Sequence, residues 1–156
     1  MKNNKGFSLV ELIIVIAIMA ILVGVMAPQL IKYIEKTNVS SDTQLADSVK
    51  TAITTAMMDP EVINTPNNGI PASDAVTAVS GITNGAFKDA FEEIMGCTVS
   101  EVDDQVKSSP AKNNTGDKVY FEIVGSNSVH VSIDGTDTAG KKQSHTKFTA
   151  GAIWVD

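Results

Sequence analysis

Phe7-Ser-Leu-Val-Glu11-Leu-Ile-Ile-Val-Ile-Ala-Ile-Met-Ala-Ile21-Leu22 opens the main apolar run of this 156-residue chain. Residues 12–31 carry no charged side chain, and Gln29 is their only strongly polar member. An α-helix of about 20 apolar residues crosses the roughly 30 Å hydrocarbon core of a bilayer, and this run supplies 20. The run therefore predicts one helix that can span a membrane.

Charges on either side of the run indicate its orientation. Lys2 and Lys5 precede it, whereas Lys32, Glu35 and Lys36 follow it with mixed sign. Because basic residues favour the cytoplasmic side of a membrane, we expect the amino terminus to lie inside and the rest of the chain outside.

A secretory signal peptide is an alternative interpretation, because it also has a basic start and an apolar region. Such signals are cut after the apolar region, at small residues of the A-x-A kind. The corresponding segment here, Val25-Met26-Ala27, lacks that pattern and is followed by Pro28, which obstructs cleavage. We therefore expect the apolar run to be retained.

The amino terminus as a whole resembles that of a type IV prepilin over about the first 35 residues: Met1-Lys-Asn-Asn-Lys-Gly6, then Phe7, Glu11 and the uninterrupted run. The resemblance implies that a prepilin peptidase cuts between Gly6 and Phe7 and methylates the new Phe7 amine. The leader 1–6 is then lost, and the apolar helix stays in the mature product.

Glu11 stands at the head of the apolar run. An ionised side chain inside a bilayer costs about 2.5–3.5 kcal/mol on insertion scales, and such residues are usually paired and functional. Near the end of the span the carboxylate could also reach the headgroups. In the filament that the resemblance implies, Glu11 pairs with the Phe7 amine of the neighbouring subunit, where low polarity strengthens the attraction. Assembly would then select subunits in the correct axial register.

The helical pattern continues beyond the run and changes character. Apolar residues recur at spacings of three and four, with Asp42, Asp47, Lys50 and Thr54 between them. Asp59-Pro60 is expected to end the helix near Met58, because the residue before a proline disfavours helical geometry. The apolar stripe consists of Leu45, Ala46, Val49, Ala52, Ile53, Ala56 and Met57.

Pro28 lies inside the apolar run. It has no amide hydrogen, and its ring crowds the carbonyl of Gly24, which predicts a kink or a locally melted turn between the two residues. The resemblance implies that this segment unwinds when pili assemble or stretch.

Turn residues and changes of period organise the rest of the chain. Short helices are expected at 73–79 and at 86–95, the second stopped by Gly96, and the acidic stretch 100–115 is expected to be a surface loop. Alternation predicts strands at 119–123 and 129–133, and 143–149 and 152–155 offer one or two more. An antiparallel sheet packed on the back half of the long helix would bury the apolar face of the sheet and the apolar stripe of the helix against each other. The core side of the first two strands is expected to hold Val119, Phe121, Ile123, Val129, Val131 and Ile133.

Residues that could bind a metal are sparse. Cys97 is the only cysteine, which excludes an intrachain disulfide and a site of several thiolates. Many Gram-negative pilins carry a cysteine pair, so this departure favours a Gram-positive source. His130 and His145 lack metal-ligand spacing and are expected at the surface. Asp134 and Asp137 form a weak calcium candidate in a stretch that is foremost a hairpin signal.

Catalysis and nucleic-acid binding are not predicted. A nucleophile with a matching base and orienting acid cannot be assembled from the sequence, so we expect neither an enzyme nor a cofactor. The formal net charge is −6 and the chain contains no arginine, which argues against a phosphate-binding surface on the isolated head.

The chain is thus expected to have an α+β pilin fold in three parts: leader 1–6, transmembrane or filament-core helix 7–35, and globular head 36–156. The head comprises an amphipathic helix 36–58, a helix and loop region 59–117 and a sheet 118–156. The resemblance implies a structural type IV pilus subunit, held in the cytoplasmic membrane as a single-pass precursor and polymerised into an extracellular helical homopolymer.

That homopolymer would serve adhesion, twitching motility, biofilm formation or DNA uptake. Its implied partners are copies of itself, the prepilin peptidase, an inner platform protein and a cytoplasmic ATPase.

Two alternatives for the function of the chain remain open. One is a major pseudopilin of type II secretion or of a competence pilus, and the other is a single-span membrane-anchored binding domain that never polymerises.

Overall fold

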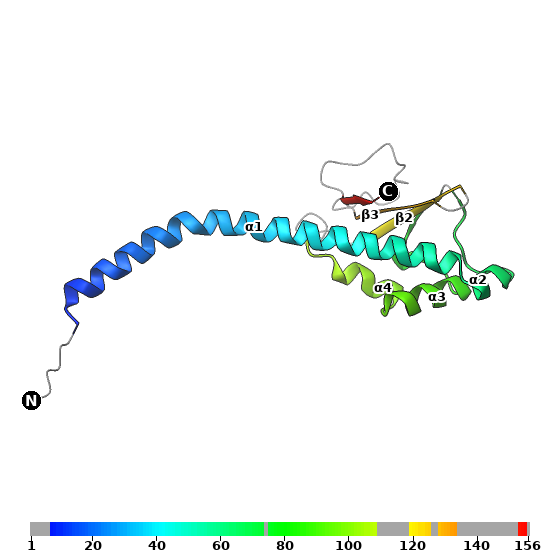
Figure 1. Cartoon of the computed structure of the whole chain (residues 1–156), viewed down its shortest axis with the longest axis horizontal. Coiled ribbons are helices and arrows are strands. Elements are labelled where there is room, and N and C mark those ends of the chain that lie inside the picture. Colours follow the sequence, from blue (N-terminus) through cyan, green and yellow to red (C-terminus); the bar gives the residue numbers. More distant parts are fainter. Residues whose placement is uncertain (1–6, 74, 109–118, 126–127, 134–152, 156) are drawn as a thin grey trace, which may run out of the picture. The chain divides into compact units, whose positions relative to one another are not determined.

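The computed structural model describes residues 7–73, 75–108, 119–125, 128–133 and 153–155 (Figure 1). The chain divides into two compact units, Met1–Lys36 and Thr37–Asp156. The amino-terminal part of helix α1 (Leu9–Met57) belongs to the first unit, and all the other described elements belong to the second.

Helix α1 ends where the sequence predicts. Its last residue is Met57, and Asp59 follows with extended backbone angles. Asp59 also caps the next helix, α2 (Pro60–Asn64), because its side chain accepts a hydrogen bond of 2.7 Å from the Glu61 amide. The proline stands at the first helical position, where its missing amide hydrogen costs nothing. One dipeptide therefore stops α1 and starts α2.

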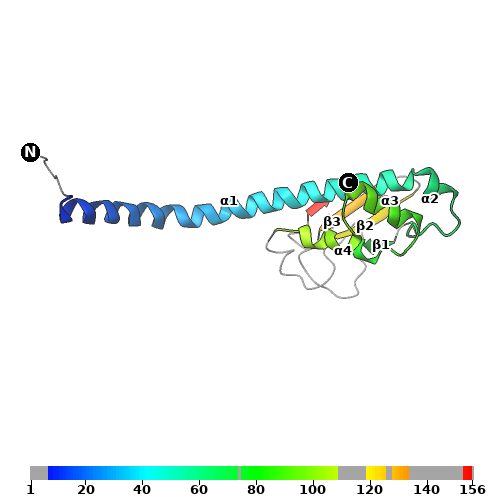
Figure 2. The same ribbon diagram turned by 90° about the horizontal axis from the view of Figure 1, so that it is seen from below.

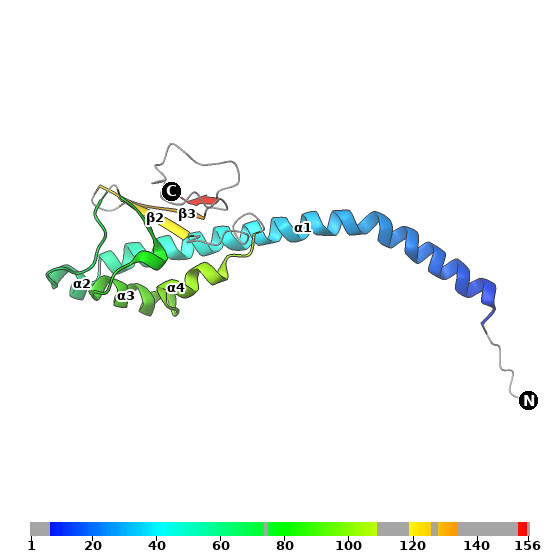
Figure 3. The ribbon, with the colours of Figure 1, turned by 180° about the vertical axis from the view of Figure 1, so that it is seen from behind.

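The carboxy-terminal part of α1 buries one stripe, as the spacing of its apolar residues predicts. Six of the seven predicted residues are buried and Met57 packs partly buried against them. Figures 1 and 3 show the sheet on one side of this part of the helix and α2, α3 and α4 on the other. A single hydrophobic core joins the helix to both. The six buried residues are Leu45, Ala46, Val49, Ala52, Ile53 and Ala56.

Asp42 is fully buried, although the sequence pattern groups it with the polar residues of α1. Its two carboxylate oxygens accept hydrogen bonds from the backbone amides of Lys107 (2.8 Å) and Ser108 (2.9 Å). Charge-assisted bonds of this kind are about twice as strong as neutral ones. The carboxylate thereby fastens a distant segment of the chain onto α1.

Helix α3 (Ala86–Met95) has the predicted bounds, and Gly96 stops it in the left-handed conformation at φ 70°. The helix presents Phe87 and Phe91 to the core, where both are fully buried. Its first turn is held by the loop that follows α2, because the Phe87 amide donates to the Asn68 carbonyl at 2.9 Å.

Gly85, immediately before α3, lies against that loop. A Cβ added here would come within 2.7 Å of the Asn68 carbonyl oxygen. We expect Gly85→Ala to lower the free energy of unfolding by about 1–3 kcal/mol, because overpacking forces the backbone to shift. Thermal unfolding of the full chain measures this. Gly81→Ala is the matched control, since its nearest neighbour, the Ala78 Cβ, would lie 3.9 Å away. Equal stability of the two variants would contradict the prediction.

The helix predicted at 73–79 is wrong. Residues Val76–Ala78 form strand β1, and Val79–Gly81 form a short 3-10 helix, η1. Strand β1 pairs antiparallel with β2 (Val119–Val124). The β-branched residues Val76 and Thr77 suit a strand. Pairing with β1 also gives the backbone amides and carbonyls at the edge of β2 their hydrogen-bond partners. The spacing of residues along 73–79 contains no sign of this pairing.

The surface loop predicted at 100–115 is also wrong in its described part. Val99–Val102 form helix α4, Asp103–Gln105 form the 3-10 helix η2, and residues 109–115 lie outside the described ranges. Glu101 closes a capping box on α4 by accepting from the Thr98 amide at 2.8 Å. Asp103 accepts from the Val119 amide at 2.9 Å. These acidic residues therefore hold local structure together rather than only facing solvent.

The sheet has four strands in the order β1-β2-β3-β4, and every neighbouring pair is antiparallel. Strand β3 spans Ser128–Ile133 and β4 spans Ile153–Val155. Figure 2 shows β1, β2 and β3 side by side. Both predicted strands are confirmed, and the predicted strand at 152–155 is confirmed as β4, whereas 143–149 lies outside the described residues.

The face of β2 and β3 that enters the core is the predicted one. The register places Val119 opposite Ile133, Phe121 opposite Val131 and Ile123 opposite Val129, and all six are buried. The other face carries Glu122 opposite His130, and His130 is half-buried there rather than fully at the surface.

Candidate functional site

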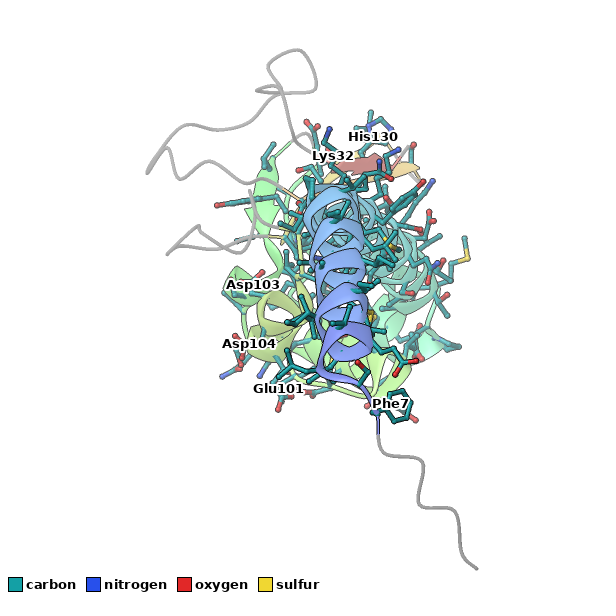
Figure 4. All side chains as sticks on the ribbon, turned by 90° about the vertical axis from the view of Figure 1, so that its left-hand side faces the viewer. Phe7, Lys32, Glu101, Asp103, Asp104 and His130 are labelled. Carbon is teal, nitrogen blue, oxygen red and sulfur yellow. The ribbon has the colours of Figure 1, made fainter. Side chains whose placement is uncertain are left out.

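The candidate site is the amino-terminal part of α1, where the sequence places processing and assembly. Phe7 precedes the first helical turn and is 89% exposed (Figure 4). Gly6, on the other side of the predicted cleavage position, lies outside the described residues. Phe7 is therefore open to solvent in the described structure.

Glu11 caps its own helix. The Ser8 amide donates a hydrogen bond of 2.9 Å to Glu11 Oε2, and Leu9 is the first helical residue. A carboxylate three residues after the capping position satisfies a backbone donor and interacts favourably with the helix dipole. Sequence reasoning missed this role, although the spacing Ser8-Leu-Val-Glu11 is a capping-box signature.

The Glu11 side chain is exposed, and its bond to the Ser8 amide uses one of the two carboxylate oxygens. An ionised carboxylate has about four lone-pair sites for hydrogen-bond donors. The carboxylate can therefore keep its bond to the Ser8 amide and still accept a cation from another molecule. Capping and intermolecular pairing are compatible in this geometry.

In α1, the side chains of residues 12–31 form an apolar surface on every side. Among the described residues, α1 is the one helix long and apolar enough to cross a membrane, and none of its apolar window is buried. A helix that is apolar all round requires lipid or protein around it. The large apolar side chains between Leu9 and Ile34 are each at least 51% exposed.

Residues 24–28 belong to the continuous helix α1, so the structure has no melted turn there, while the kink that the sequence predicts as the other outcome stays a prediction. Proline removes one backbone hydrogen bond, and the apolar residues on either side continue the helix through it. A Cβ added at Gly24 would meet nothing within 4 Å. The space beside the Gly24 Cα is therefore open, one turn before the proline.

Metal-binding residues do not assemble in the part of the chain that the structure describes. No group of three or more His, Cys, Asp or Glu residues is placed to hold a metal ion there. The calcium candidates Asp134 and Asp137, and also His145, lie outside the described ranges. Cys97 is half-buried and accepts a hydrogen bond of 3.3 Å from Gln105 Nε2.

Glu101 is a described group whose titration is clearly shifted. Hydrogen bonds from the Thr98 amide and the Thr98 hydroxyl hold the pKa of its carboxyl below the usual range. A lowered pKa means that this cap contributes at neutral pH and is lost as the pH falls through the folded-state value. The group is exposed (Figure 4) and belongs to the capping box of α4, not to the candidate site.

Comparison with known proteins places this amino terminus in a recognised group. Residues 1–27 match the family model described as the prokaryotic N-terminal methylation motif. A fimbrial protein from Dichelobacter nodosus is 31% identical over 148 residues, which cover 88% of this chain and 91% of that protein. No solved structure matches this chain.

Other relatives match over shorter stretches. A type IV major fimbrial protein FimA from Dichelobacter nodosus (strain VCS1703A) is 40% identical over 73 residues, 47% of this chain and 43% of that protein. A fimbrial protein from Moraxella nonliquefaciens is 47% identical over 55 residues, 35% of this chain and 36% of that protein. These relatives come from Gram-negative bacteria, so they do not support the Gram-positive source inferred from the missing cysteine pair.

Proposed function

The chain belongs to the type IV fimbrial proteins, and we propose that it is a structural pilus subunit that polymerises through the apolar part of α1. The observation that carries the proposal is the exposed apolar surface between Leu9 and Ile34, headed by Glu11. Lipid covers such a surface before assembly, and neighbouring copies of the same helix cover it afterwards. The relatives bear the names of fimbrial proteins, so a pseudopilin and a single-span receptor are not favoured.

In the proposed filament, Glu11 meets the Phe7 amine of the next subunit. Two opposite charges attract far more strongly in an apolar surrounding than in water. A subunit displaced along the filament axis would leave both charges unpaired, which costs several kcal/mol. The pair therefore selects one axial register among the many that a uniformly apolar helix permits.

Processing and localisation complete the proposal. A prepilin peptidase removes residues 1–6 and methylates Phe7, and the precursor waits in the cytoplasmic membrane with its amino terminus inside. A platform protein and a cytoplasmic ATPase drive its transfer into an extracellular filament. Gly24 and Pro28 form the segment of α1 that unwinds on assembly, because proline has already removed one helical hydrogen bond there.

Mass spectrometry of the native protein tests the processing step. We expect the mass of a chain that begins at Phe7 and carries one methyl group on its amine. Gly6→Leu is the matched variant and should retain the leader, because a bulky side chain replaces the glycine at the cleavage position. A native chain that still begins at Met1 would argue for the receptor alternative, and one that begins beyond Pro28 would argue for a secretory signal.

A further inference from the structure

A shallow hollow lies on one face of α1, just beyond the apolar run. Its volume is about 190 Å³, and it is lined by Gln29, Lys32, Tyr33 and Lys36. These residues are spaced 0, 3, 4 and 7 along the helix, which places them on one face. All four are exposed, and we call them the headgroup face.

The headgroup face has the composition and the depth of a membrane-surface site. The uncharged run ends at Ile31, so Lys32 is the first charged residue outside the hydrocarbon of a spanning helix. Lysine and tyrosine are favoured at this level, because each joins an apolar stem or ring to a polar tip. Lys32 projects away from the helix axis (Figure 4).

Charge makes this face suited to an anion. Lys32 and Lys36 contribute +2, and the neighbouring Glu35 contributes −1, which leaves +1 over residues 29–36. Each ammonium has three hydrogen-bond donors and no acceptor. Two such groups one helical turn apart can therefore donate to the same phosphate.

We propose that the headgroup face binds the phosphate group of an anionic phospholipid in the outward-facing leaflet. The two ammonium groups donate to the phosphate oxygens, and the amide of Gln29 and the hydroxyl of Tyr33 border the same hollow. The site holds the subunit at a defined depth in the membrane before assembly. This proposal depends on the proposed function only because it requires a precursor that spans the membrane.

The test uses the full chain, one copy per lipid nanodisc, and spin-labelled phosphatidylglycerol and phosphatidylcholine as probes. The fraction of each lipid immobilised by the protein is measured by electron paramagnetic resonance. A lysine near an anionic surface contributes roughly a five-fold preference. We expect the native chain to prefer phosphatidylglycerol by about that factor or more. Lys32→Gln/Lys36→Gln should lose the part of the preference that the headgroup face supplies and keep only the part that Lys2 and Lys5 contribute at the other end of the apolar run.

The matched control is Lys50→Gln/Lys88→Gln, which removes the same charge from the second unit of the chain and should keep the preference. Equal immobilisation of both lipids by the native chain would overturn the proposal, and so would an unchanged preference in Lys32→Gln/Lys36→Gln. Loss of the preference in the control as well would also overturn it, since net charge rather than the hollow would then attract the lipid.

Filament formation is scored separately for the same variants. A Glu11 variant that forms no filaments but keeps the lipid preference supports the headgroup face independently. Normal filaments without any lipid preference in the native chain would remove this proposal and leave the function of the subunit intact. A failure of the lipid-binding proposal can therefore be distinguished from a failure of the proposed pilus function.

Discussion

Replacing Glu11 with valine is expected to abolish filaments while leaving membrane insertion intact. Valine makes the helix more apolar, so insertion is favoured. In the filament, however, the Phe7 amine of the neighbouring subunit would be left buried without a counter-charge. Removing one partner of a buried ion pair costs about 3–5 kcal/mol, which corresponds to roughly a hundred-fold or greater loss in association.

Glu11→Gln separates the two roles of this residue. A glutamine can still accept the bond from the Ser8 amide, because glutamine also serves in capping boxes, but it carries no charge. We expect the Glu11→Gln chain to insert and to form a normal first helical turn, yet to assemble almost as poorly as the Glu11→Val chain. Electron microscopy of surface filaments, together with membrane fractionation, measures both effects.

Full piliation with either substitution would remove the electrostatic account of register. If glutamine alone restored filaments, capping of α1 would be the function of Glu11, and pairing with Phe7 would be dispensable. A suitable control is Glu35→Gln, which lies beyond the apolar run and should assemble normally.

Removing the carboxylate of Asp42 is expected to give the largest loss of stability in the head. In Asp42→Ala the amides of Lys107 and Ser108 lose their acceptor. The bond to the Ser108 amide is buried, whereas the bond to the Lys107 amide is part-buried. A buried donor without a partner costs about 1–3 kcal/mol, so we expect the loss of stability to be at least of that size, with a smaller addition from Lys107. Asp42→Asn keeps one carbonyl acceptor and should lie between the native chain and Asp42→Ala.

Hydrogen exchange followed by mass spectrometry measures the loss of these two hydrogen bonds at the amides that donate them. The amides of Lys107 and Ser108 should lose protection in Asp42→Ala, and the melting temperature of the full chain in detergent should fall by several degrees. Asp47→Ala is the matched control, because Asp47 is exposed on the same helix. Unchanged protection of both amides would show that the carboxylate does not fasten this segment.

The two predictions test different parts of one helix. Glu11 acts on contacts between subunits and on the first turn of α1. Because that turn belongs to the first unit, the loss of Glu11 should leave the melting temperature of the second unit unchanged. Asp42 acts on contacts within the second unit, so its loss should lower stability before it affects assembly. Measuring both properties for both residues therefore separates contacts between subunits from contacts within the second unit.

Short-range patterns in the sequence are enough to predict much of this fold. The end of α1 at Met57, the helix Ala86–Met95 with Gly96 behind it, and the core face of Val119–Val124 and Ser128–Ile133 all follow from periodicity and from single stop residues. The capping interactions of Ser8 with Glu11 and of Thr98 with Glu101 were equally visible in the spacing but were missed. Such features depend on residues within one or two turns of each other.

The tertiary structure alone decided the rest. Val76–Ala78 became a strand because β2 offered an edge to pair with, and Asp42 became buried because backbone amides 65 and 66 residues away folded onto it. Periodicity describes which side of an element is apolar, but it contains no information about which distant backbone groups will need a partner. The sequence was therefore enough to identify the apolar run and Glu11, whereas the anchoring role of the Asp42 carboxylate could be identified only from the tertiary structure.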